Sequence, residues 1–176
     1  MKVAIFGGTG FVGSYILDEL ISNNFLPKVL VRKGSESKLI ANCEIVYGDI
    51  ADEASIKETI RDTKAIIYNI GIIREFPSKG ITYTKLHYEG LRTCIKIAEE
   101  MNVNRFILMS ANGVKANGTG YQTSKFKGEQ ELQASTLDWT IFRPSLIFGK
   151  PYHPVHHEFC SQLRDDMLSL PIPAPL

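Results

Sequence analysis

The segment YQTSKFKGE, residues 121–129, places Lys125 four residues after Tyr121. On a helix these side chains share a face, because residues i and i+4 are neighbours on its surface. A lysine ammonium beside a phenol favours the phenolate, which lowers a phenol pKa from its ordinary value of about 10. Such a tyrosine can pass a proton to or from a carbonyl or alcohol oxygen. The spacing alone carries little weight, since seven tyrosines and thirteen lysines produce it by chance in roughly every second chain of this length.

A second candidate for chemistry is the glycine-rich segment GGTGFVG, which follows an apolar run and precedes a helical pattern. Its glycines satisfy G-x-G-x-x-G, a spacing that lets the chain turn tightly and lets a pyrophosphate approach the bare backbone. The helix expected from Phe11 would direct its unpaired N–H groups and positive dipole end at that phosphate, and Gly13 would let it pack closely on the strand. This context favours a dinucleotide site over a purely structural turn. The residues expected to line that site are Gly7, Gly8, Thr9, Gly10, Phe11, Val12 and Gly13.

The end of the second expected strand indicates which dinucleotide binds. An acidic residue there would bind the adenosine ribose and repel a 2′-phosphate. The chain has no acidic residue between Phe25 and Gly34, and it has Arg32 and Lys33 instead. Because a guanidinium binds phosphate in a bidentate manner, we expect NADPH in preference to NADH. The alternative is a solvated pair of surface cations.

Other polar and small residues follow the third and fourth expected strands. Asp49 and Ile50 lie in the segment YGDI, where the carboxylate can accept a hydrogen bond from the adenine amino group. Asn69 and Gly71 end the fourth strand and are expected along the cofactor. Ordinary strand-to-helix turn chemistry is the alternative for all four.

Short β-rich runs alternate with helical patterns along most of the chain. Strands are expected at residues 2–6, 28–32, 43–49, 64–71, 105–110 and 138–144, and helices at 11–24, 53–62, 82–103, 121–135 and 157–171. This alternation implies βαβ units and a mostly parallel sheet. Six strands with crossovers predict an α/β fold, a doubly wound sheet in three αβα layers with strand order 3-2-1-4-5-6.

The predicted sheet determines where the tyrosine–lysine pair lies. Helix 121–135 follows the fifth strand, so the pair lies at the same carboxyl edge as the glycine turn. There the Lys125 ammonium can bind the nicotinamide ribose hydroxyls, and Tyr121 can transfer a proton while hydride moves at the nicotinamide ring. Ser110, which ends the fifth strand, is placed to bond the same substrate oxygen. Position, rather than spacing, raises the pair above chance.

The motifs GGTGFVG, GDI, HYEG, MSANG, YQTSKFKGE and DWTIFRPSLIFG, in this order, resemble the short-chain dehydrogenase/reductase superfamily. The chain is most similar to its atypical, epimerase-like branch, which includes the nucleotide-binding accessory subunit of respiratory complex I. The resemblance covers residues 1 to about 150 and implies an NAD(P)-binding Rossmann fold. It also implies that Tyr121 and Lys125 are the active-site pair and that Ser110 is the companion serine. The segment implied to pass near the nicotinamide and substrate is Arg143, Pro144 and Ser145.

The C-terminal part departs from this resemblance. Relatives continue with substrate-binding elements, whereas 26 residues follow Lys150 here, and the loop between Ser110 and Tyr121 is shorter than in epimerases. We therefore expect residues 1–150 to form the NAD(P)-binding domain and residues 151–176 to be the start of a substrate or cap segment that is cut short. Helix 157–171 carries Phe159, Leu163 and Met167 on one face and is expected over the pocket mouth.

Composition argues against several other functions. A net charge of +1 gives no reason to expect nucleic acid or an anionic membrane surface as a partner. The longest apolar run, AIIYNIGII, is half the length that a membrane span needs. Three scattered cysteines without a CxxC pair are typical of a protein of the reducing cytoplasm. No metal site is expected, because histidines in a proline-rich connection, such as His153, His156 and His157, more often belong to a solvated loop than to a zinc site.

Two functions remain open from the sequence. The first is an NADPH-dependent oxidoreductase or epimerase/dehydratase-like enzyme that acts on a small carbonyl or alcohol substrate. The second is a non-catalytic NADPH-binding module that stabilises or regulates a larger complex. In this superfamily the helices corresponding to residues 83–101 and 121–135 are the usual dimer surface, so a homodimer is open as well.

Overall fold

The computed structural model describes residues 1–39, 42–150 and 158–169. Within these ranges, six strands form one sheet in which every neighbouring pair is parallel. The strand order is β3-β2-β1-β4-β5-β6, which confirms the expected doubly wound arrangement. The strands are β1 (Lys2–Phe6), β2 (Leu26–Val31), β3 (Glu44–Tyr47), β4 (Ala65–Tyr68), β5 (Arg105–Met109) and β6 (Asp138–Phe142).

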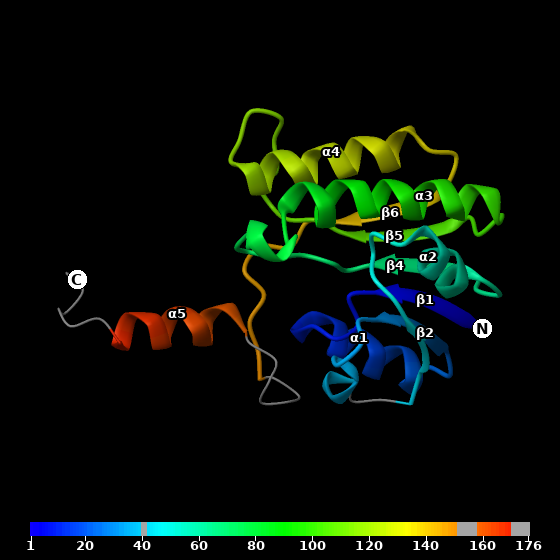
Figure 1. Ribbon diagram of the computed structural model, residues 1–176, viewed down its shortest axis with the longest axis horizontal. Helices are drawn as coiled ribbons and strands as arrows, with labels where there is room; N and C mark the ends of the chain where they lie inside the picture. The colour runs from blue at the N-terminus through cyan, green and yellow to red at the C-terminus, as the bar shows by residue number, and fades with distance from the viewer. Residues whose placement is uncertain (40–41, 151–157, 170–176) are drawn as a thin grey trace.

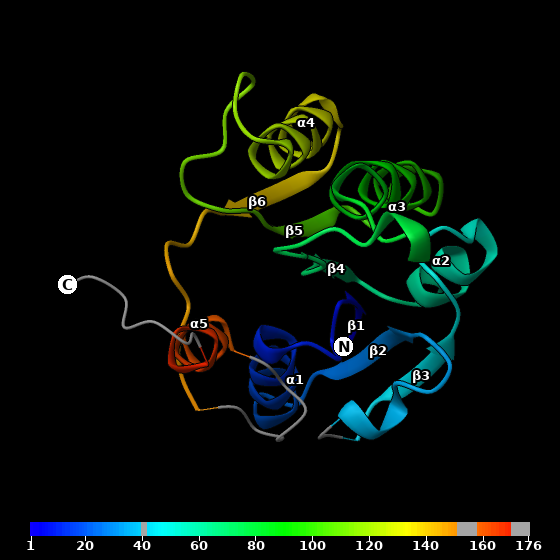
Figure 2. The ribbon, with the colours of Figure 1, turned by 60° about the vertical axis from the view of Figure 1, so that its left-hand side comes forward.

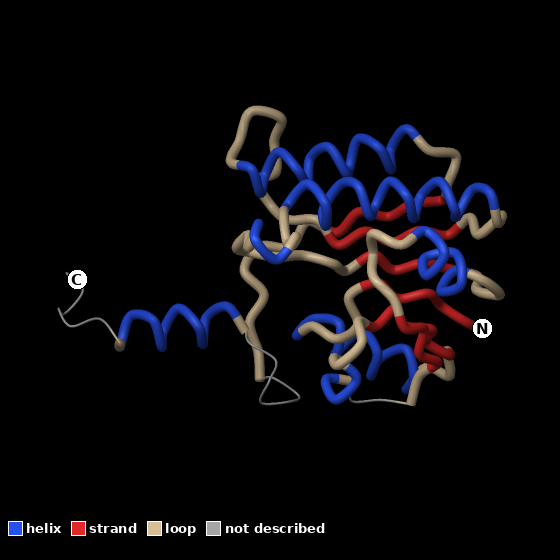
Figure 3. The backbone as a smooth tube through the Cα atoms, viewed as in Figure 1, coloured by secondary structure: helices blue, strands red, loops and turns tan. Residues whose placement is uncertain are grey.

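Helices cover both faces of the sheet. The two ribbon views place α1 on one face and α2, α3 and α4 on the other (Figures 1 and 2). Figure 3 shows the same layers, with helices in blue on either side of the red strands. The helices are α1 (Phe11–Ser22), α2 (Glu53–Ile60), α3 (Gly90–Glu100), α4 (Gly120–Ala134) and α5 (Phe159–Leu168), with short 3₁₀ turns at Glu36–Lys38 and Pro77–Lys79.

The core lies on both faces of the central strands. Strand β1 is buried along almost its whole length, as expected for a parallel strand covered on both sides. Because side chains alternate along a strand, Val3 and Ile5 join Leu17 of α1 in one apolar cluster. Ala4 and Phe6 point the other way and belong to the cluster formed with α2, α3 and α4. This packing fixes the strand ends from which the site is built.

Helix α4 begins directly before the tyrosine–lysine pair because its first turn is capped. The Thr119 hydroxyl accepts the Gln122 N–H, and the Gln122 side-chain oxygen accepts the Thr119 N–H at 2.9 Å. This reciprocal capping box satisfies donors that a helix start otherwise leaves unpaired. Tyr121 therefore lies in the first turn and Lys125 one turn later on the same face.

Two helices differ from the expectation. The helix expected over residues 82–103 begins as a π-helical segment, η3 (Thr84–Glu89), and continues as α3 from Gly90. The helix expected over 157–171 is present as α5, but it extends away from the sheet and has no buried residue (Figure 1). The expectation that α5 covers the pocket mouth is wrong for most of its length. Within the described residues of α5, Phe159 lines the cavity, whereas Leu163 and Met167 on the same apolar face are exposed.

Candidate cofactor and active site

A cavity of about 840 Å³ opens at the carboxyl edge of the sheet. Its lining comes from the segments that follow β1, β2 and β3 on one side, and from those that follow β4, β5 and β6 on the other. The boundary between β1 and β4 is the point where the strand order reverses, which is where open α/β sheets bind ligands. The predicted site residues that line this cavity are Gly7, Thr9, Gly10, Phe11, Val12, Arg32, Asp49, Ile50, Asn69, Gly71, Ser110, Tyr121, Lys125 and Pro144.

The glycines of the turn have two different roles. Gly7 has a φ of 93°, and a Cβ there would lie 2.8 Å from the Asn69 backbone, so the turn itself requires glycine. Gly8 and Gly13 do not line the cavity. A Cβ on Gly13 would overlap the Gly7 carbonyl oxygen, which explains the close packing of α1 on the turn. At Gly10, by contrast, the nearest atom to such a Cβ is 3.6 Å away, so a ligand can approach the backbone there.

The start of α1 faces the cavity without a side-chain cap. Its N-cap residue is Gly10, no side chain accepts from the first turn, and that turn carries no acidic residue. Thr9, Gly10, Phe11 and Val12 all line the cavity. Unpaired N–H groups and the positive end of the helix dipole together suit a phosphate. These residues therefore fit the pyrophosphate of a dinucleotide.

The segments that follow β2 and β3 carry the residues predicted to select the cofactor. Arg32 follows β2, lines the cavity and is exposed, whereas Lys33 is exposed but does not line it. Asp49 lines the cavity as well, and one of its carboxylate oxygens accepts the Ala51 N–H at 2.9 Å. Turn chemistry thus accounts for one Asp49 oxygen. Of the two predicted cations, Arg32 lines the cavity and Lys33 does not.

Tyr121 and Lys125 lie together on the opposite wall. The Lys125 ammonium is 5.8 Å from the centre of the Tyr121 ring, and it donates a 3.0 Å hydrogen bond to the carbonyl of Met109 at the end of β5. This bond ties α4 to the sheet edge. Burial lowers the pKa of Lys125 from 10.5 to about 8, although the carboxylate of Glu129 opposes that shift.

The expected lowering of the Tyr121 pKa is wrong for this structure. Its pKa is raised, first because the phenol is half-buried and second because Tyr83 lies nearby. Loss of hydration disfavours the phenolate and is the larger of these two causes. The phenol is therefore protonated at neutral pH, which makes it a proton donor in its resting state.

Ser110 completes the group at the end of β5. Its side chain is 5% exposed, and its hydroxyl has no hydrogen-bond partner among the described residues. Its backbone N–H donates to the Phe142 carbonyl at 2.8 Å, which holds the segment in place. Buried polar groups are normally paired, so an orphaned hydroxyl on a cavity wall fits a ligand oxygen.

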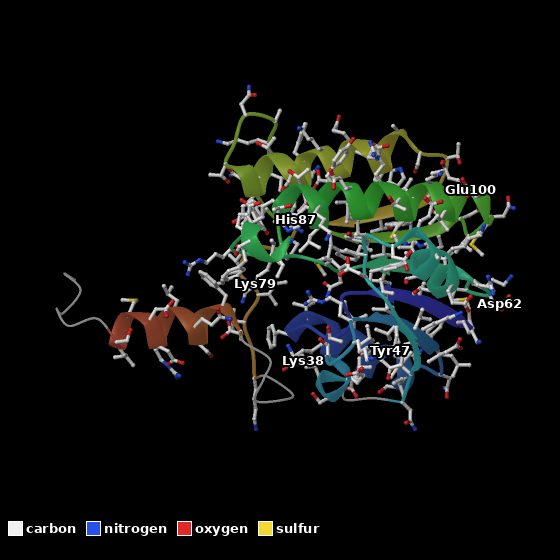
Figure 4. All side chains as sticks on the ribbon, viewed as in Figure 1. Lys38, Tyr47, Asp62, Lys79, His87 and Glu100 are labelled. Atoms are coloured by element: carbon white, nitrogen blue, oxygen red, sulfur yellow. The ribbon has the colours of Figure 1, made fainter. Side chains whose placement is uncertain are left out.

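His87 supports this wall from behind, although no role for it was predicted. The Ile72 N–H donates to its Nε2 at 3.1 Å, so the neutral ring carries its proton on Nδ1. That nitrogen lies 3.0 Å from the Ser124 hydroxyl, which in turn donates to the Tyr121 carbonyl at 3.0 Å. Burial lowers the pKa of His87 to about 3, with a smaller contribution from Lys125, so the ring stays neutral. His87, labelled in Figure 4, thereby links the loop after β4 to the start of α4.

Three aromatic rings pack around this chain of hydrogen bonds. Tyr83 stacks on His87 with 5.4 Å between ring centres, and the Tyr121 ring meets His87 edge-on at 5.3 Å. The Tyr83 hydroxyl donates to the Ile73 carbonyl at 2.6 Å. The sequence drew attention to Tyr121 alone among these rings, because the three come together only through the fold.

Arg143 has a structural role next to the site. It does not line the cavity, although Pro144 and Ser145 do. Its guanidinium binds both carboxylate oxygens of Glu129, with a shortest distance of 2.6 Å. Glu129 is fully buried in α4, so this ion pair fixes the chain after β6 against that helix.

Metal and membrane chemistry find no support in the described part of the chain. No three His, Cys, Asp or Glu side chains there gather in a way that could hold a metal ion. The histidine-rich run at 153–157 lies outside the described residues. Among residues 1–39, 42–150 and 158–169, no helix is both long enough and apolar enough to span a membrane.

Comparison with known proteins identifies the family. Residues 7–158 match the family model described as NAD(P)H-binding, which covers most of the chain. The chain belongs to the NAD(P)H-binding family. The glycine turn and the uncapped α1 terminus of this NAD(P)H-binding protein lie within the matched region.

Curated relatives differ in their stated roles. The chain is 26% identical over 156 residues to the 40 kDa subunit of NADH-ubiquinone oxidoreductase from Neurospora crassa, a match that covers 82% of this chain and 40% of the relative. It is 27% identical over 150 residues to ceramide reductase from Caulobacter vibrioides, covering 84% of this chain and 46% of the relative. The chain thus spans less than half the length of these relatives.

Solved structures agree on the fold. The UDP-glucose 4-epimerase of Thermus thermophilus in complex with NAD has a TM-score of 0.76 and 17% identity, covering 98% of this chain and 64% of that one. Together with the family match, this likeness confirms the expected NAD(P)-binding Rossmann fold.

Proposed function

We propose that this chain is an NADPH-dependent enzyme of the short-chain dehydrogenase type, an oxidoreductase or epimerase-like protein acting on a carbonyl or alcohol group. One observation carries the proposal. Ser110, Tyr121 and Lys125 line the same cavity as the uncapped N-terminus of α1. A bound nicotinamide cofactor would supply or accept the hydride. The chain itself must then hold the substrate oxygen and move one proton.

Each of the three side chains has a role in this chemistry. Tyr121, whose raised pKa keeps it protonated, would donate its proton to the carbonyl oxygen during reduction. Ser110 would donate a hydrogen bond from its orphaned hydroxyl to the same oxygen. Lys125 would bind the ribose hydroxyls next to the nicotinamide and, by its charge, ease the return of the proton in the oxidative direction.

The preference for NADPH over NADH is part of the proposal. Arg32 is the cation that faces the expected position of the adenosine ribose, and no acidic residue follows β2 to repel a 2′-phosphate. A planar guanidinium binds phosphate through paired, charge-assisted hydrogen bonds. We therefore assign the selection between the two cofactors to Arg32.

Replacement of Tyr121 by phenylalanine tests the proposal. With NADPH and a panel of methyl ketones, Tyr121→Phe is expected to slow NADPH oxidation by at least about a hundredfold, the usual worth of a positioned proton donor. The Kd for NADPH should stay within a few-fold, because the phenol is remote from the phosphate turn. Tyr47→Phe is the matched control, since Tyr47 is 57% exposed on the edge strand β3. A rate of NADPH oxidation in Tyr121→Phe equal to that of the wild type would refute the enzymatic proposal.

The second candidate function is a non-catalytic NADPH-binding module of a larger assembly. One observation favours it: a relative is named as the 40 kDa subunit of the mitochondrial NADH-ubiquinone oxidoreductase. This function predicts tight NADPH binding, no oxidation with any ketone of the panel, and co-purification with a partner. Recovery of free monomers alone from native lysate would count against it.

A further inference from the structure

The two halves of the cavity differ in chemistry. The half that follows β1, β2 and β3 presents the glycine turn, the start of α1 and the charged side chains of Arg32 and Asp49. The half that follows β4, β5 and β6 has fewer polar than apolar residues in its lining. Its polar residues are Asn69, Ser110, Asn112, Tyr121, Lys125 and Ser145, and its large apolar residues include Ile70, Ile72, Ile73, Ile81, Leu86, Leu146, Ile147 and Phe159.

Several of these apolar side chains are exposed to the cavity and to solvent. Ile73 is 59% exposed and Leu146 is 54% exposed, although both are large aliphatic residues. Phe159, at the first turn of α5, is 38% exposed. Exposed apolar residues gathered in a concavity with a few convergent polar groups are typical of a binding site for an apolar ligand.

This half lacks the groups that hold a diphosphate, within the described part of its lining. Lys125 is the one cation there, and its ammonium donates to the Met109 carbonyl. The first turn of α4 is closed by the capping box of Thr119 and Gln122. The first turn of α5 is capped by the buried Glu158 carboxylate, which repels phosphate. A nucleotide sugar would therefore find a single cation, which the proposed function assigns to the cofactor ribose, and no open helix start among these residues.

The apolar wall is held rigidly beside Tyr121. His87 accepts the Ile72 N–H, and the Tyr83 hydroxyl donates to the Ile73 carbonyl. Both aromatic residues pack against the Tyr121 ring. The hydrocarbon surface is thus positioned before any ligand arrives, which reduces the entropy lost on binding.

We propose that this half of the cavity binds a carbonyl compound or alcohol with an extended hydrocarbon chain, rather than a nucleotide sugar. The oxygen would lie at Tyr121 and Ser110, and the chain would cover Ile72, Ile73 and Leu146. The reaction of such a compound rests on the proposed function, whereas its binding does not require turnover.

Binding of methyl ketones to the protein saturated with NADP⁺ tests this proposal, because the oxidised cofactor cannot reduce a ketone. Methyl ethyl, methyl butyl and methyl hexyl ketone would be titrated by saturation-transfer NMR, with UDP-glucose as the competing class. Affinity is expected to rise about fourfold for each added methylene, the fold-change that corresponds to about 0.8 kcal/mol per buried CH₂. UDP-glucose is expected neither to bind nor to displace methyl hexyl ketone.

A pair of variants locates the binding. Ile73→Ser should weaken the binding of methyl hexyl ketone several-fold and make the affinity depend less on the length of the ketone chain. Leu26→Ser is the matched control, because Leu26 is also 59% exposed but lies at the start of β2, away from the cavity. An affinity independent of chain length, an equal loss in both variants, or displacement of the ketone by UDP-glucose would overturn the proposal. Ketone binding without NADPH oxidation would instead refute only the proposed reaction.

Discussion

Replacing His87 with phenylalanine would separate ring packing from hydrogen bonding behind the tyrosine–lysine pair. Phenylalanine can keep the contacts that the imidazole makes with Tyr83 and Tyr121, at 5.4 and 5.3 Å between ring centres. It cannot accept the Ile72 N–H or donate to the Ser124 hydroxyl. The link between the loop after β4 and the start of α4 would then be lost, while the volume of the core is nearly preserved.

The expected loss of stability follows from these two hydrogen bonds. A buried polar group left without its partner costs about 1–3 kcal/mol. The Ile72 N–H is partly buried and can recover some hydration, and the Ser124 hydroxyl keeps its bond to the Tyr121 carbonyl. We therefore expect His87→Phe to reduce the free energy of unfolding at pH 7 by about 2 kcal/mol. Tyr88→Phe, one position along η3, loses only a 3.3 Å hydrogen bond to Glu131. It should change the free energy of unfolding by less than about 0.5 kcal/mol.

The pH dependence gives this substitution a second signature. In the folded protein the pKa of His87 is lowered from 6.5 to about 3, mainly by burial. Between these two values the unfolded chain binds one proton more than the folded chain does. The free energy of unfolding therefore falls as the pH drops below 6.5, by up to about 1.4 kcal/mol per pH unit from this group. His87→Phe lacks this contribution, so its stability deficit should narrow from pH 7 to pH 5.

Urea unfolding of wild type, His87→Phe and Tyr88→Phe at several pH values between 5 and 7.5 would measure both effects. Turnover of the ketone panel should fall in His87→Phe because Tyr121 is less firmly placed, while the NADPH Kd stays within a few-fold. The reasoning is refuted if the deficit at pH 7 is absent, or if it is the same at pH 5 as at pH 7.

Three further predictions concern the cofactor turn and the ion pair of α4. Arg32→Ala should weaken the binding of NADPH about ten- to a hundredfold, with little effect on the binding of NADH, as expected for lost charge-assisted hydrogen bonds. Lys33→Ala should change both affinities only slightly. Equal losses of affinity for the two cofactors in Arg32→Ala would contradict this. Gly10→Ala should be as stable as the wild type, but its affinity for NADPH in calorimetric titration should be at least tenfold lower, because the added methyl group occupies the space open to phosphate. Gly13→Ala should instead lower the melting temperature, because its methyl overlaps the backbone of the turn, and equal melting temperatures for the two variants would contradict that distinction. Arg143→Ala should lower the free energy of unfolding in urea by roughly 3 kcal/mol, since it leaves the fully buried carboxylate of Glu129 without its partner; a loss below about 1 kcal/mol would contradict a stabilising role for this ion pair.

The sequence predicted the sheet well because its signals are local. The runs at 2–6 and 105–110 are compact, strongly apolar and bounded by turns, and the observed strands Lys2–Phe6 and Arg105–Met109 nearly coincide with them. Strand order followed from the crossovers and the position of the glycine turn, which are rules of topology. The start of α4 was also close, because its cap residues are adjacent in sequence.

The features that the sequence did not predict depend on contacts between distant residues. The lowered pKa expected for Tyr121 considered only its neighbour Lys125, whereas burial of the phenol, with a smaller electrostatic contribution from Tyr83, raises the pKa. His87 gains its partners from the loop after β4 and from α4, neither of which its own helix pattern reveals. Helical periodicity predicted α5 itself, but it cannot show whether the apolar face of a helix packs on the sheet, and no residue of α5 is buried.

A crystal structure of the protein with NADPH tests the central claim most directly. The account predicts the pyrophosphate at the start of α1 and the nicotinamide at the Tyr121 wall. There the phenol oxygen should lie within about 5 Å of nicotinamide C4, which leaves a substrate oxygen within hydrogen-bond reach of it. Ser110 should face the same open space, lined by Ile72 and Ile73. A nicotinamide placed elsewhere, or side chains filling the space beside the phenol, would contradict hydride transfer and favour a structural or regulatory role for the cofactor.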